Sequence, residues 1–532
     1  MESSRRVTNG RSQSIGLVAL FALSTLYLVP VFPHHVSVNE FTRWATVAGA
    51  VERGTLDVRW SEPLLGVLHD VSPFGNHVYS NKAPGLALLS APGYLVARLV
   101  LGPPTGSNMR WSLYAMRVVG VTLPTILLGW LFLRRDRPDP FALGTLLFAT
   151  PVFIYGTLLF SHATAAALLY AGYRAAFSTS RTARHLLLAG ALCGVGTLAE
   201  YPVAAATIAI GLGLLLEKSP GRVSRTALFV AGGLPFAAAL GLYNRMLFGS
   251  FFSLSTAHEG AEDVALQASR GVFGLMLPTI SGTFTLLASP ARGLFFYSPV
   301  LIVGALAVLA SATRGSTRER VRLAIAVTLV VAFAGFPFNH GGWCLGSRYI
   351  VAVVPFLVEA ASERDPEAPN PVSALLFGAS AVLCVVPMLT IPFPPAEIPF
   401  VHPGFVRPFL AEGFLSPSLG SFAVAGPLSL APVLLALLAA LFLTVRAGGR
   451  GAILGAALGF LLAVGYAALP IRQPKSHVIL EAFILDTFFV DTGRLSALSH
   501  EEMRPEDRAS LISLTAMSAE KRRLGPDDWP YR

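Results

Sequence analysis

The residues Val38-Asn39-Glu40-Phe41-Thr42-Arg43-Trp44-Ala45 form the centre of a polar stretch, Pro33 to Asn81, in an otherwise apolar chain. An apolar segment precedes this stretch, and Lys82-Ala83-Pro84-Gly85 follows it. Most other charged residues lie in short connectors, near the C-terminus, or singly within apolar segments. The long polar stretch is therefore the first place to look for a function.

The composition is typical of a membrane protein. The chain has 532 residues, of which 53% are hydrophobic and only 13% charged, whereas soluble domains carry about 25% charged residues. Apolar runs of roughly twenty residues recur, and this length matches the hydrocarbon thickness of a bilayer. Because lipid offers the backbone no hydrogen-bond partners, these runs predict an all-α polytopic membrane protein.

The formal net charge of +10 does not indicate nucleic-acid binding. Arg and Lys cluster between apolar runs, and this pattern indicates membrane topology. No basic stripe with interleaved aromatic residues is present. The cysteines, Cys193, Cys344 and Cys384, are far apart and form neither a disulfide framework nor a metal-ligand spacing. We interpret them as structural thiols.

The basic clusters predict the side on which each segment lies. Arginines precede the first apolar segment, about residues 15–32, so we expect a cytoplasmic N-terminus and an outer polar stretch. The segment Ala83–Gly102 can be a span or a helix lying at the outer interface. Only the interfacial alternative places the next basic cluster, residues 134–137, in the cytoplasm.

Continued alternation predicts about thirteen transmembrane helices in the plasma or inner membrane, with the C-terminus outside. We expect a transmembrane domain over residues 1–470, in which residues 33–110 form an outer loop with interfacial helices. Residues 471–532 are more polar, and we expect an outer-face tail or small domain there. The stretch Val478–Val490 of this tail can fold against the outer loops.

Glu40 and Arg43 are candidates for chemistry. They share a face if a helix begins at Glu40 and continues through Val51. A carboxylate at the boundary between membrane and water can act as a general base, because partial desolvation and a nearby cation shift its proton affinity in opposite directions. The alternative is a solvated glutamate that forms a salt bridge with Arg43.

The order of these features resembles the GT-C superfamily of glycosyltransferases, in the branch of protein O-mannosyltransferases and aminoarabinose transferases. Glu40 to Ala45 is similar to the family's Asp-x-x-Arg-Tyr-Ala motif, and Lys82-Ala83-Pro84 is similar to its Lys-Pro element. Arg117 stands near the outer end of the second span, as in the family. The resemblance covers Met1 to about Leu216 and is mostly topological afterwards.

The resemblance implies a polyprenyl-phosphate-sugar donor and an outer catalytic loop over residues 33–110. Glu40 is then the catalytic residue, as a base or a metal ligand, and a divalent metal ion is a candidate cofactor. Lys82 is expected to pair with the donor's phosphate, with Arg43 and Tyr79 as further substrate contacts. A lysine that snorkels from a helix start is the alternative for Lys82.

Two positions depart from the family pattern. His162 stands where relatives often have an acidic residue, and Glu200, in the break Glu200-Tyr201-Pro202, stands where they often have a lysine. His162 can bind a metal or a phosphate, or be a structural histidine at a helix end. Glu200 can supply the acidic group that is missing near His162. Glu40, His162 and Glu200 are therefore the candidate metal ligands.

The outer connector Phe338 to Tyr349 is the last candidate and is similar to a stretch of many GT-C-like membrane proteins. Its glycines allow close approach to a ligand, while His340, Trp343 and Arg348 can contact a sugar or phosphate. The alternative is an interfacial aromatic belt with a snorkelling arginine. Ser289 to Pro299 is also similar to such proteins, and we assign it mainly a packing role.

The sequence thus predicts an inverting glycosyltransferase that moves a sugar to a lipid, a cell-wall glycan or a protein. A transporter or flippase of a lipid-linked or small solute is one alternative, and a non-catalytic partner of the same fold is another. An enzyme is favoured because the candidate residues lie at the outer boundary rather than at mid-membrane. We expect the following residues around one outer cavity: Glu40, Lys82, His162, Glu200 and Arg348.

Overall fold

The described part of the chain is mostly helical. The computed structural model describes residues 2–32, 37–135, 138–261, 265–266, 274–364, 369–489 and 492–522. Pro33, at the start of the polar stretch, lies outside the described residues. Part of the basic cluster 134–137 and the end of the polar tail also lie outside them.

The helices and strands follow one another along the two halves of the chain. The first half contains α1 (Glu2–Tyr27), α2 (Val38–Arg53), α3 (Glu62–Leu65), β1 (Val71–Phe74), β2 (His77–Ser80), α4 (Pro84–Leu101), α5 (Met109–Arg117), α6 (Leu123–Leu133), α7 (Pro140–Phe148), α8 (Pro151–Tyr155), α9 (Ser161–Ala176), α10 (Ala183–Ala199), α11 (Val203–Leu216) and α12 (Arg222–Phe248). The second half contains α14 (Ile280–Leu287), α15 (Leu294–Tyr297), α16 (Leu301–Arg314), α17 (Thr317–Ala334), α18 (Val354–Arg364), α19 (Pro371–Val385), α20 (Arg407–Ala411), α21 (Ala431–Val445), α22 (Gly449–Ala467), α23 (Lys475–Phe488), α24 (Arg494–Leu498) and α25 (Pro505–Arg522).

The chain is a multi-pass membrane protein. Within the described residues, five segments are long and apolar enough to cross a bilayer: Pro84–Leu101, Met109–Leu133, Arg222–Phe248, Pro371–Leu389 and Gly426–Ala467. Shorter apolar helices accompany them. By length and composition α4 is among the five, so its interfacial position stays a prediction, as does the count of about thirteen spans.

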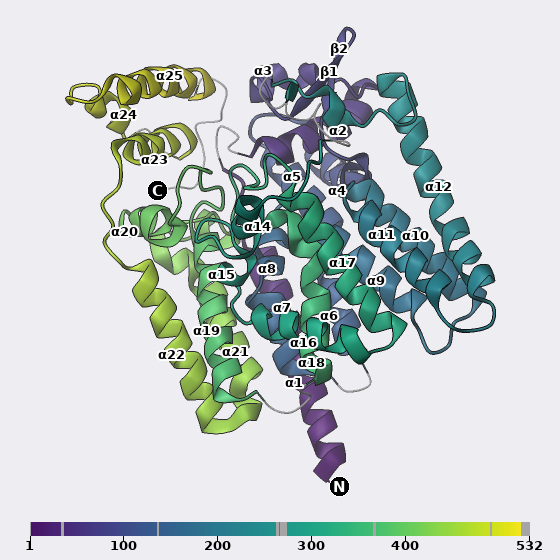
Figure 1. Cartoon of the computed structure of the whole chain (residues 1–532). Helices are drawn as coiled ribbons and strands as arrows, with labels where there is room; N and C mark the ends of the chain where they lie inside the picture. The colour runs from purple at the N-terminus through teal and green to yellow at the C-terminus, as the bar shows by residue number, and fades with distance from the viewer. Residues whose placement is uncertain are drawn as a thin grey trace.

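The polar elements gather at one end of the molecule. Figure 1 shows α2, α3, β1 and β2 at the end opposite to the N-terminus of α1, and it shows α23 to α25 at that same end. Rings of the tail pack on two distant segments, with Phe489 at 5.1 Å from Phe32 and Phe483 at 6.5 Å from Trp343. The tail therefore folds against these two segments, and their position on the outer face stays a prediction.

A short hairpin within the polar stretch was not foreseen. β1 and β2 are antiparallel, with Val71 opposite Ser80 and Phe74 opposite His77. The turn between them contains Gly75, whose φ of 58° is a left-handed conformation that glycine adopts without strain. Asp70 precedes β1 and Asn81 follows β2, and the hairpin brings these two residues together at its base.

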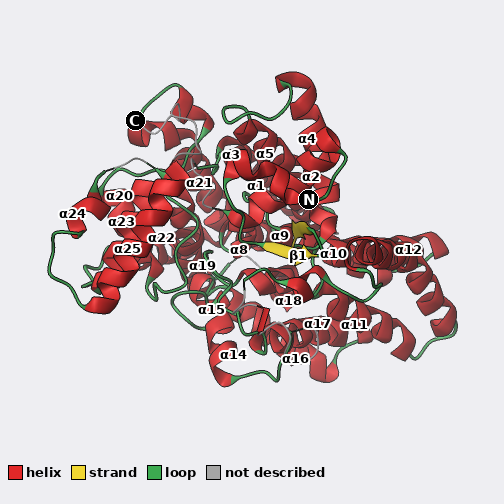
Figure 2. Ribbon diagram, turned by 90° about the horizontal axis from the view of Figure 1, so that it is seen from above, coloured by secondary structure: helices red, strands yellow, loops and turns green. Residues whose placement is uncertain are grey.

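The long helix α12 lies at the edge of the molecule and packs mainly on α10. Figure 2, seen from above, shows α12 nearly end-on beside α10. The helices meet through glycine: a Cβ atom on Gly190 would lie 1.8 Å from the carbonyl oxygen of Phe229. Only a residue without a side chain permits so close an approach.

A network of ion pairs joins α9, α17 and α18 through Glu359. Glu359 is fully buried and accepts hydrogen bonds from Arg318 Nη2 at 2.8 Å and from the Tyr170 hydroxyl at 3.1 Å. Arg174 and Arg322 lie 3.6 and 3.5 Å from the same carboxylate. Because a buried charge needs partners, this carboxylate holds three helices together.

We expect Glu359→Gln to lower the free energy of unfolding by roughly 3–5 kcal/mol, since it removes the fully buried carboxylate of the network and leaves Arg318 and Arg322 with the more exposed Glu363. The matched control is Glu412→Gln, which removes the partner of Arg494 at the surface and should cost less than about 1 kcal/mol. Thermal unfolding in detergent measures both variants. Equal losses in the two variants would show that the network does not hold the helices.

Candidate functional site

Helix α2 turns Glu40 into the interior. Trp44 is fully buried, and its indole N–H donates to Ser112 Oγ at 2.8 Å. Residues four apart share a helix face, so Glu40 points toward the same interior as Trp44. Only 4% of Glu40 is exposed. The glutamate is therefore buried, in contrast to the solvated alternative.

The Glu40 carboxylate is fixed to the turn before α9. Its Oε1 accepts a hydrogen bond from the backbone N–H of Leu159 at 2.6 Å. Burial raises the pKa of Glu40 to about 7, although the Leu159 N–H and the charges of Arg117 and Arg43 lower it in part. A carboxyl group with a pKa near neutrality can accept a proton at ordinary pH, as a general base must.

Arg43 lies one turn further on and contacts Asn39 rather than Glu40. Its Nη1 donates to the backbone carbonyl of Asn39 at 2.9 Å and also to the Asn39 side chain. The buried Nε has no hydrogen-bond acceptor among the described residues. Burial lowers the pKa of Arg43 to about 10, which still leaves the guanidinium charged. A buried cationic donor without an acceptor favours an anionic ligand.

Lys82 pairs with Asp70 at the base of the β1–β2 hairpin. The Lys82 Nζ lies 3.0 Å from Asp70 Oδ2, so the ammonium group is not directed toward lipid. At Asp70, burial raises the carboxyl pKa, but Lys82 together with the charges of Arg348 and Arg43 outweighs this effect, and the net pKa is lowered. At Lys82, burial lowers the ammonium pKa more than Asp70 raises it. The surroundings of Lys82 therefore still favour additional negative charge.

His162 and Glu200 form a buried pair between α9 and the break that separates α10 from α11. His162 Nδ1 lies 2.9 Å from Glu200 Oε1, and both side chains are less than a tenth exposed. The ring of Tyr155 lies edge-on to His162 at 5.2 Å, and that of Tyr349 at 5.9 Å. Glu200 thus supplies the acidic group next to His162, as the departures from the family pattern suggested.

Arg348 comes from the connector before α18 and lies over two aromatic rings. Its guanidinium carbon is 4.8 Å from the ring centre of Tyr349 and 5.5 Å from that of Phe160. Its Nη2 donates to the Tyr349 hydroxyl at 3.1 Å, while its buried Nε has no acceptor among the described residues. Arg348 is therefore a second cation with a free donor.

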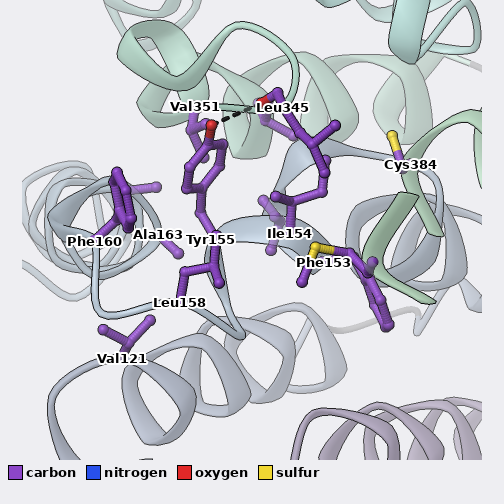
Figure 3. Close-up of a cluster of buried hydrophobic side chains, with 14 of the residues drawn as sticks. Val121, Phe153, Ile154, Tyr155, Leu158, Phe160, Ala163, Leu345, Val351 and Cys384 are labelled. Carbon is purple, nitrogen blue, oxygen red and sulfur yellow. Dashed lines mark hydrogen bonds between the residues drawn. The ribbon is translucent and has the colours of Figure 1, made fainter. Parts of the chain in front are cut away.

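The packing beneath this connector fixes its position. Figure 3 shows the Tyr155 side chain directed at Leu345, whose carbonyl accepts the hydroxyl hydrogen bond at 2.6 Å. Phe160, whose ring makes the cation–π contact with Arg348, belongs to the same cluster of buried side chains. The loop that presents Arg348 is thus held by α8 and by the segment that binds Glu40.

The structure brings most of the predicted residues into one group, which we call the charge cluster. Arg43 interacts electrostatically with Asp70, Arg348, Glu200 and Glu40. Lys82 interacts in the same way with Asp70, Glu259, Arg348 and Arg43. The predicted members of the charge cluster are Glu40, Arg43, Lys82, His162, Glu200 and Arg348.

Three predicted substrate contacts make other contacts in the structure. The ring of Tyr79, on β2, stacks on His77 at 5.8 Å and lies edge-on to Phe248 of α12. Trp343 packs on α23. His340 accepts the Gly342 N–H at 3.0 Å within its own turn. A role for Tyr79, His340 and Trp343 in substrate binding stays a prediction.

The candidate metal ligands do not form a metal site in the described part of the chain. No group of three His, Cys, Asp or Glu side chains converges among the described residues. His162 Nδ1 and Glu200 Oε1 bind each other, and Glu40 binds Leu159. This set of donors does not fit a divalent ion, and we derive no chemical step through one.

The sequence did not single out Asp70, Asn81 or Glu259. The signal for Asp70 was the Gly75-Asn76 turn, which predicts a hairpin with its two ends in contact. Asn81 Nδ2 donates to Glu259 Oε2 at 2.8 Å across 178 residues of chain. No local pattern predicts a contact of this kind.

Arg292, in the stretch to which we assigned packing, organises the outer loops. It is 1% exposed and donates to the backbone carbonyls of Ala291, His340, Gly342, Pro394 and Pro395 at 2.8–3.2 Å. Three loops that are distant in sequence therefore meet on one guanidinium group. The planar guanidinium group has five N–H donors, so it can bind carbonyls from several loops at once.

The expected cavity at the charge cluster stays a prediction. A cleft lies elsewhere, between α7, α16 and α18, and its lining includes Phe141, Leu301 and Leu357. The gathering of the charged side chains is thus observed, whereas the space for a substrate between them is expected.

Comparison with known proteins gives similarity in structure alone. No protein-family model matches the chain, and no curated protein matches it. The structure is similar to that of ArnT from Cupriavidus metallidurans in the apo state, with 17% identity, a TM-score of 0.43, and coverage of 96% of this chain and 89% of that chain. The same protein bound to undecaprenyl phosphate matches with 14% identity, a TM-score of 0.42, and coverage of 96% and 88%.

A second similar structure is the Archaeoglobus fulgidus oligosaccharyltransferase in its apo form. It matches with 12% identity, a TM-score of 0.37, and coverage of 93% of this chain and 60% of that chain. Both proteins are members of the GT-C superfamily, the family that the sequence motifs resemble. At these identities and TM-scores, the similarity does not by itself assign a fold or an activity.

Glu40→Gln is expected to change how stability depends on pH. The native state holds a proton on Glu40 up to about pH 7, whereas the unfolded state releases it near 4.5. As the pH rises through this window, the wild-type protein therefore loses about 3 kcal/mol more stability than the glutamine variant. Unfolding measured at pH 5 and pH 8 tests this. Parallel profiles of variant and wild type would contradict the buried position of Glu40.

Proposed function

We propose that the chain is a glycosyltransferase that moves a sugar from a polyprenyl-phosphate donor to a hydroxyl group on the outer face of the membrane. The observation that carries this proposal is the cation set of the charge cluster. Arg43 and Arg348 each have a buried Nε without an acceptor among the described residues, and both interact electrostatically with Lys82. A phosphate group supplies several acceptor oxygens and negative charge to such a set.

The position of the charge cluster supports a lipid-linked donor. The cluster lies in a multi-pass membrane protein, on segments adjacent to apolar helices such as α4 and α5. A polyprenyl chain would remain in the bilayer while its phosphate reaches Lys82, Arg43 and Arg348. A soluble phosphate ester would not require this apolar surrounding.

Glu40 is the proposed catalytic base. Its carboxylate would take the proton of the acceptor hydroxyl as the hydroxyl oxygen attacks the anomeric carbon of the sugar. The bond from that carbon to the phosphate oxygen breaks, and the polyprenyl phosphate leaves with the electron pair. Attack on the side opposite to the leaving group inverts the configuration of the sugar. Lys82, Arg43 and Arg348 would stabilise the charge that develops on the phosphate.

His162 and Glu200 are the proposed contacts to the sugar. The pair lies among the rings of Tyr155, Phe160 and Tyr349, and aromatic faces of this kind pack against the apolar face of a sugar ring. Glu200 Oε2 is buried without a partner among the described residues and would accept a sugar hydroxyl. The acceptor can be a lipid, a cell-wall glycan or a protein.

The proposed division of the chain follows from this assignment. Residues 1–470 form the transmembrane domain, with the catalytic loop in residues 33–110, and residues 471–532 form a tail on the outer face. A transporter requires charged groups along the path of its solute. The charge cluster instead lies with the polar elements of one end, and this favours the enzyme.

Glu40→Gln should lower sugar transfer by at least about a hundredfold while the protein stays folded, because the amide cannot take the proton. The wild-type rate should rise with pH around a midpoint near 7, where Glu40 loses its proton. The control is Glu52→Gln on the same helix, which removes the partner of Arg98 and should leave transfer largely intact. Transfer and flipping are measured together in vesicles, and flipping without transfer would identify a transporter.

Lys82→Met should weaken binding of undecaprenyl phosphate by about tenfold to a hundredfold, as loss of a charge-assisted hydrogen bond does. The control, Arg59→Met, removes a cation from the same outer loop that pairs with Asp57 at the surface. Equilibrium binding to detergent-solubilised protein distinguishes the two variants. Equal affinities in wild type and Lys82→Met would remove Lys82 from the phosphate site.

A further inference from the structure

The base of the β1–β2 hairpin places a carboxylate on the proposed phosphate-binding lysine. Val71 pairs with Ser80, and the Asn81 N–H donates to the Asp70 carbonyl at 3.3 Å. Asp70 directly precedes β1 and Lys82 lies two residues after the end of β2, so both residues lie at the base of the hairpin. The result is the 3.0 Å contact between Asp70 Oδ2 and Lys82 Nζ.

The hairpin base is held in place by a distant segment. Ser72 Oγ donates to the Ser255 carbonyl at 2.7 Å, and Ser255 Oγ donates to the Asn81 carbonyl at 2.9 Å. The Gly260 N–H donates to the Val71 carbonyl at 2.9 Å. Both ends of the hairpin are thus fixed, and Asp70 remains beside Lys82.

Asp70 differs from the other carboxylates of the charge cluster. Glu40 binds the Leu159 N–H, Glu200 binds His162, and Glu259 binds Asn81. Among the described residues, Lys82 is the side chain that pairs with the Asp70 carboxylate. Asp70 also interacts electrostatically with Arg348 and Arg43. It therefore faces the three cations that we assign to the donor's phosphate.

We propose that Asp70 is a positioning residue that competes with phosphate for Lys82 and thereby promotes release of the polyprenyl phosphate product. This inference rests on the proposed glycosyltransferase function. In the free enzyme Asp70 holds Lys82 in place, a bound phosphate shares or replaces that contact, and product departure restores it. The exchange transfers no atoms and breaks no covalent bond.

The charge of the two ligands gives this competition a direction. The donor is a phosphodiester with one negative charge, whereas the product is a phosphomonoester, whose second proton leaves near pH 6. Coulomb repulsion scales with the product of the charges, so Asp70 disfavours the doubly charged product more than the donor. The cations alone would hold the product more tightly than the donor and slow each turnover. Asp70 offsets that preference.

Asp70→Asn tests the proposal on the full chain in detergent. We expect undecaprenyl phosphate to bind about fivefold more tightly at pH 8, and the sugar-linked donor about twofold more tightly. The KM for the donor should fall together with kcat, because product release becomes slower. Asp70→Glu should restore wild-type binding. Asp57→Asn, a carboxylate of the same outer loop that pairs with Arg59 and His77, should change neither quantity.

The outcomes separate this inference from the proposed function. If Asp70→Asn weakens binding of undecaprenyl phosphate or leaves it unchanged, Asp70 only orients Lys82 and the inference fails. In a Lys82→Met background the tightening should become smaller, because the contact for which Asp70 competes is gone and only its repulsion of the phosphate remains. An unchanged tightening would also overturn the inference. If the wild-type protein does not bind undecaprenyl phosphate at all, the proposed donor fails as well. Asp70→Ser provides the neutral side chain should the asparagine variant not fold.

Discussion

A charged group that is buried away from water requires a partner, and this requirement determines the contacts at both ends of the molecule. At one end, Glu359 contacts three arginines and a tyrosine hydroxyl within one network. At the end that we predict to be outer, each carboxylate of the charge cluster has its own partner, and Arg292 is satisfied by backbone carbonyls alone. The guanidinium groups of Arg43 and Arg348 keep an unmatched donor. Arg318 and Arg322 of the Glu359 network also keep a buried Nε without an acceptor among the described residues. The two ends therefore differ in the partners of their cations: Arg318 and Arg322 pair with a carboxylate, whereas Arg43 and Arg348 donate to Asn39 and to the Tyr349 hydroxyl.

The sequence predicted the parts of this arrangement that depend on local pattern. The spacing of Glu40 and Arg43 predicted one helix face, and α2 contains both residues. The break at Glu200-Tyr201-Pro202 separates α10 from α11, and the apolar stretch of the tail forms α23. These features depend on neighbours in the chain, for which helix periodicity and proline give direct signals.

The partners of the charged residues could not be predicted in the same way. The contact of Glu40 with Leu159 spans 119 residues, and that of Asn81 with Glu259 spans 178. Such contacts depend on how helices pack, which a single sequence does not display. The salt bridge considered for Glu40 and Arg43 was the local alternative, and it is wrong because burial turns the two side chains to different partners. Arg292 was missed for a related reason. Every residue has a backbone carbonyl, so the sequence gives no signal for the carbonyls that an arginine binds.

Helix α9 is tied at both of its ends. His162 in its first turn binds Glu200, while Tyr170 and Arg174 near its last turn reach Glu359. Both ends of α9 are thus fixed by buried charged contacts. Rocking motions that expose a site alternately to either side of a membrane would have to break one of these contacts in each cycle. The contacts of α9 therefore favour a stationary helix over a rocking one.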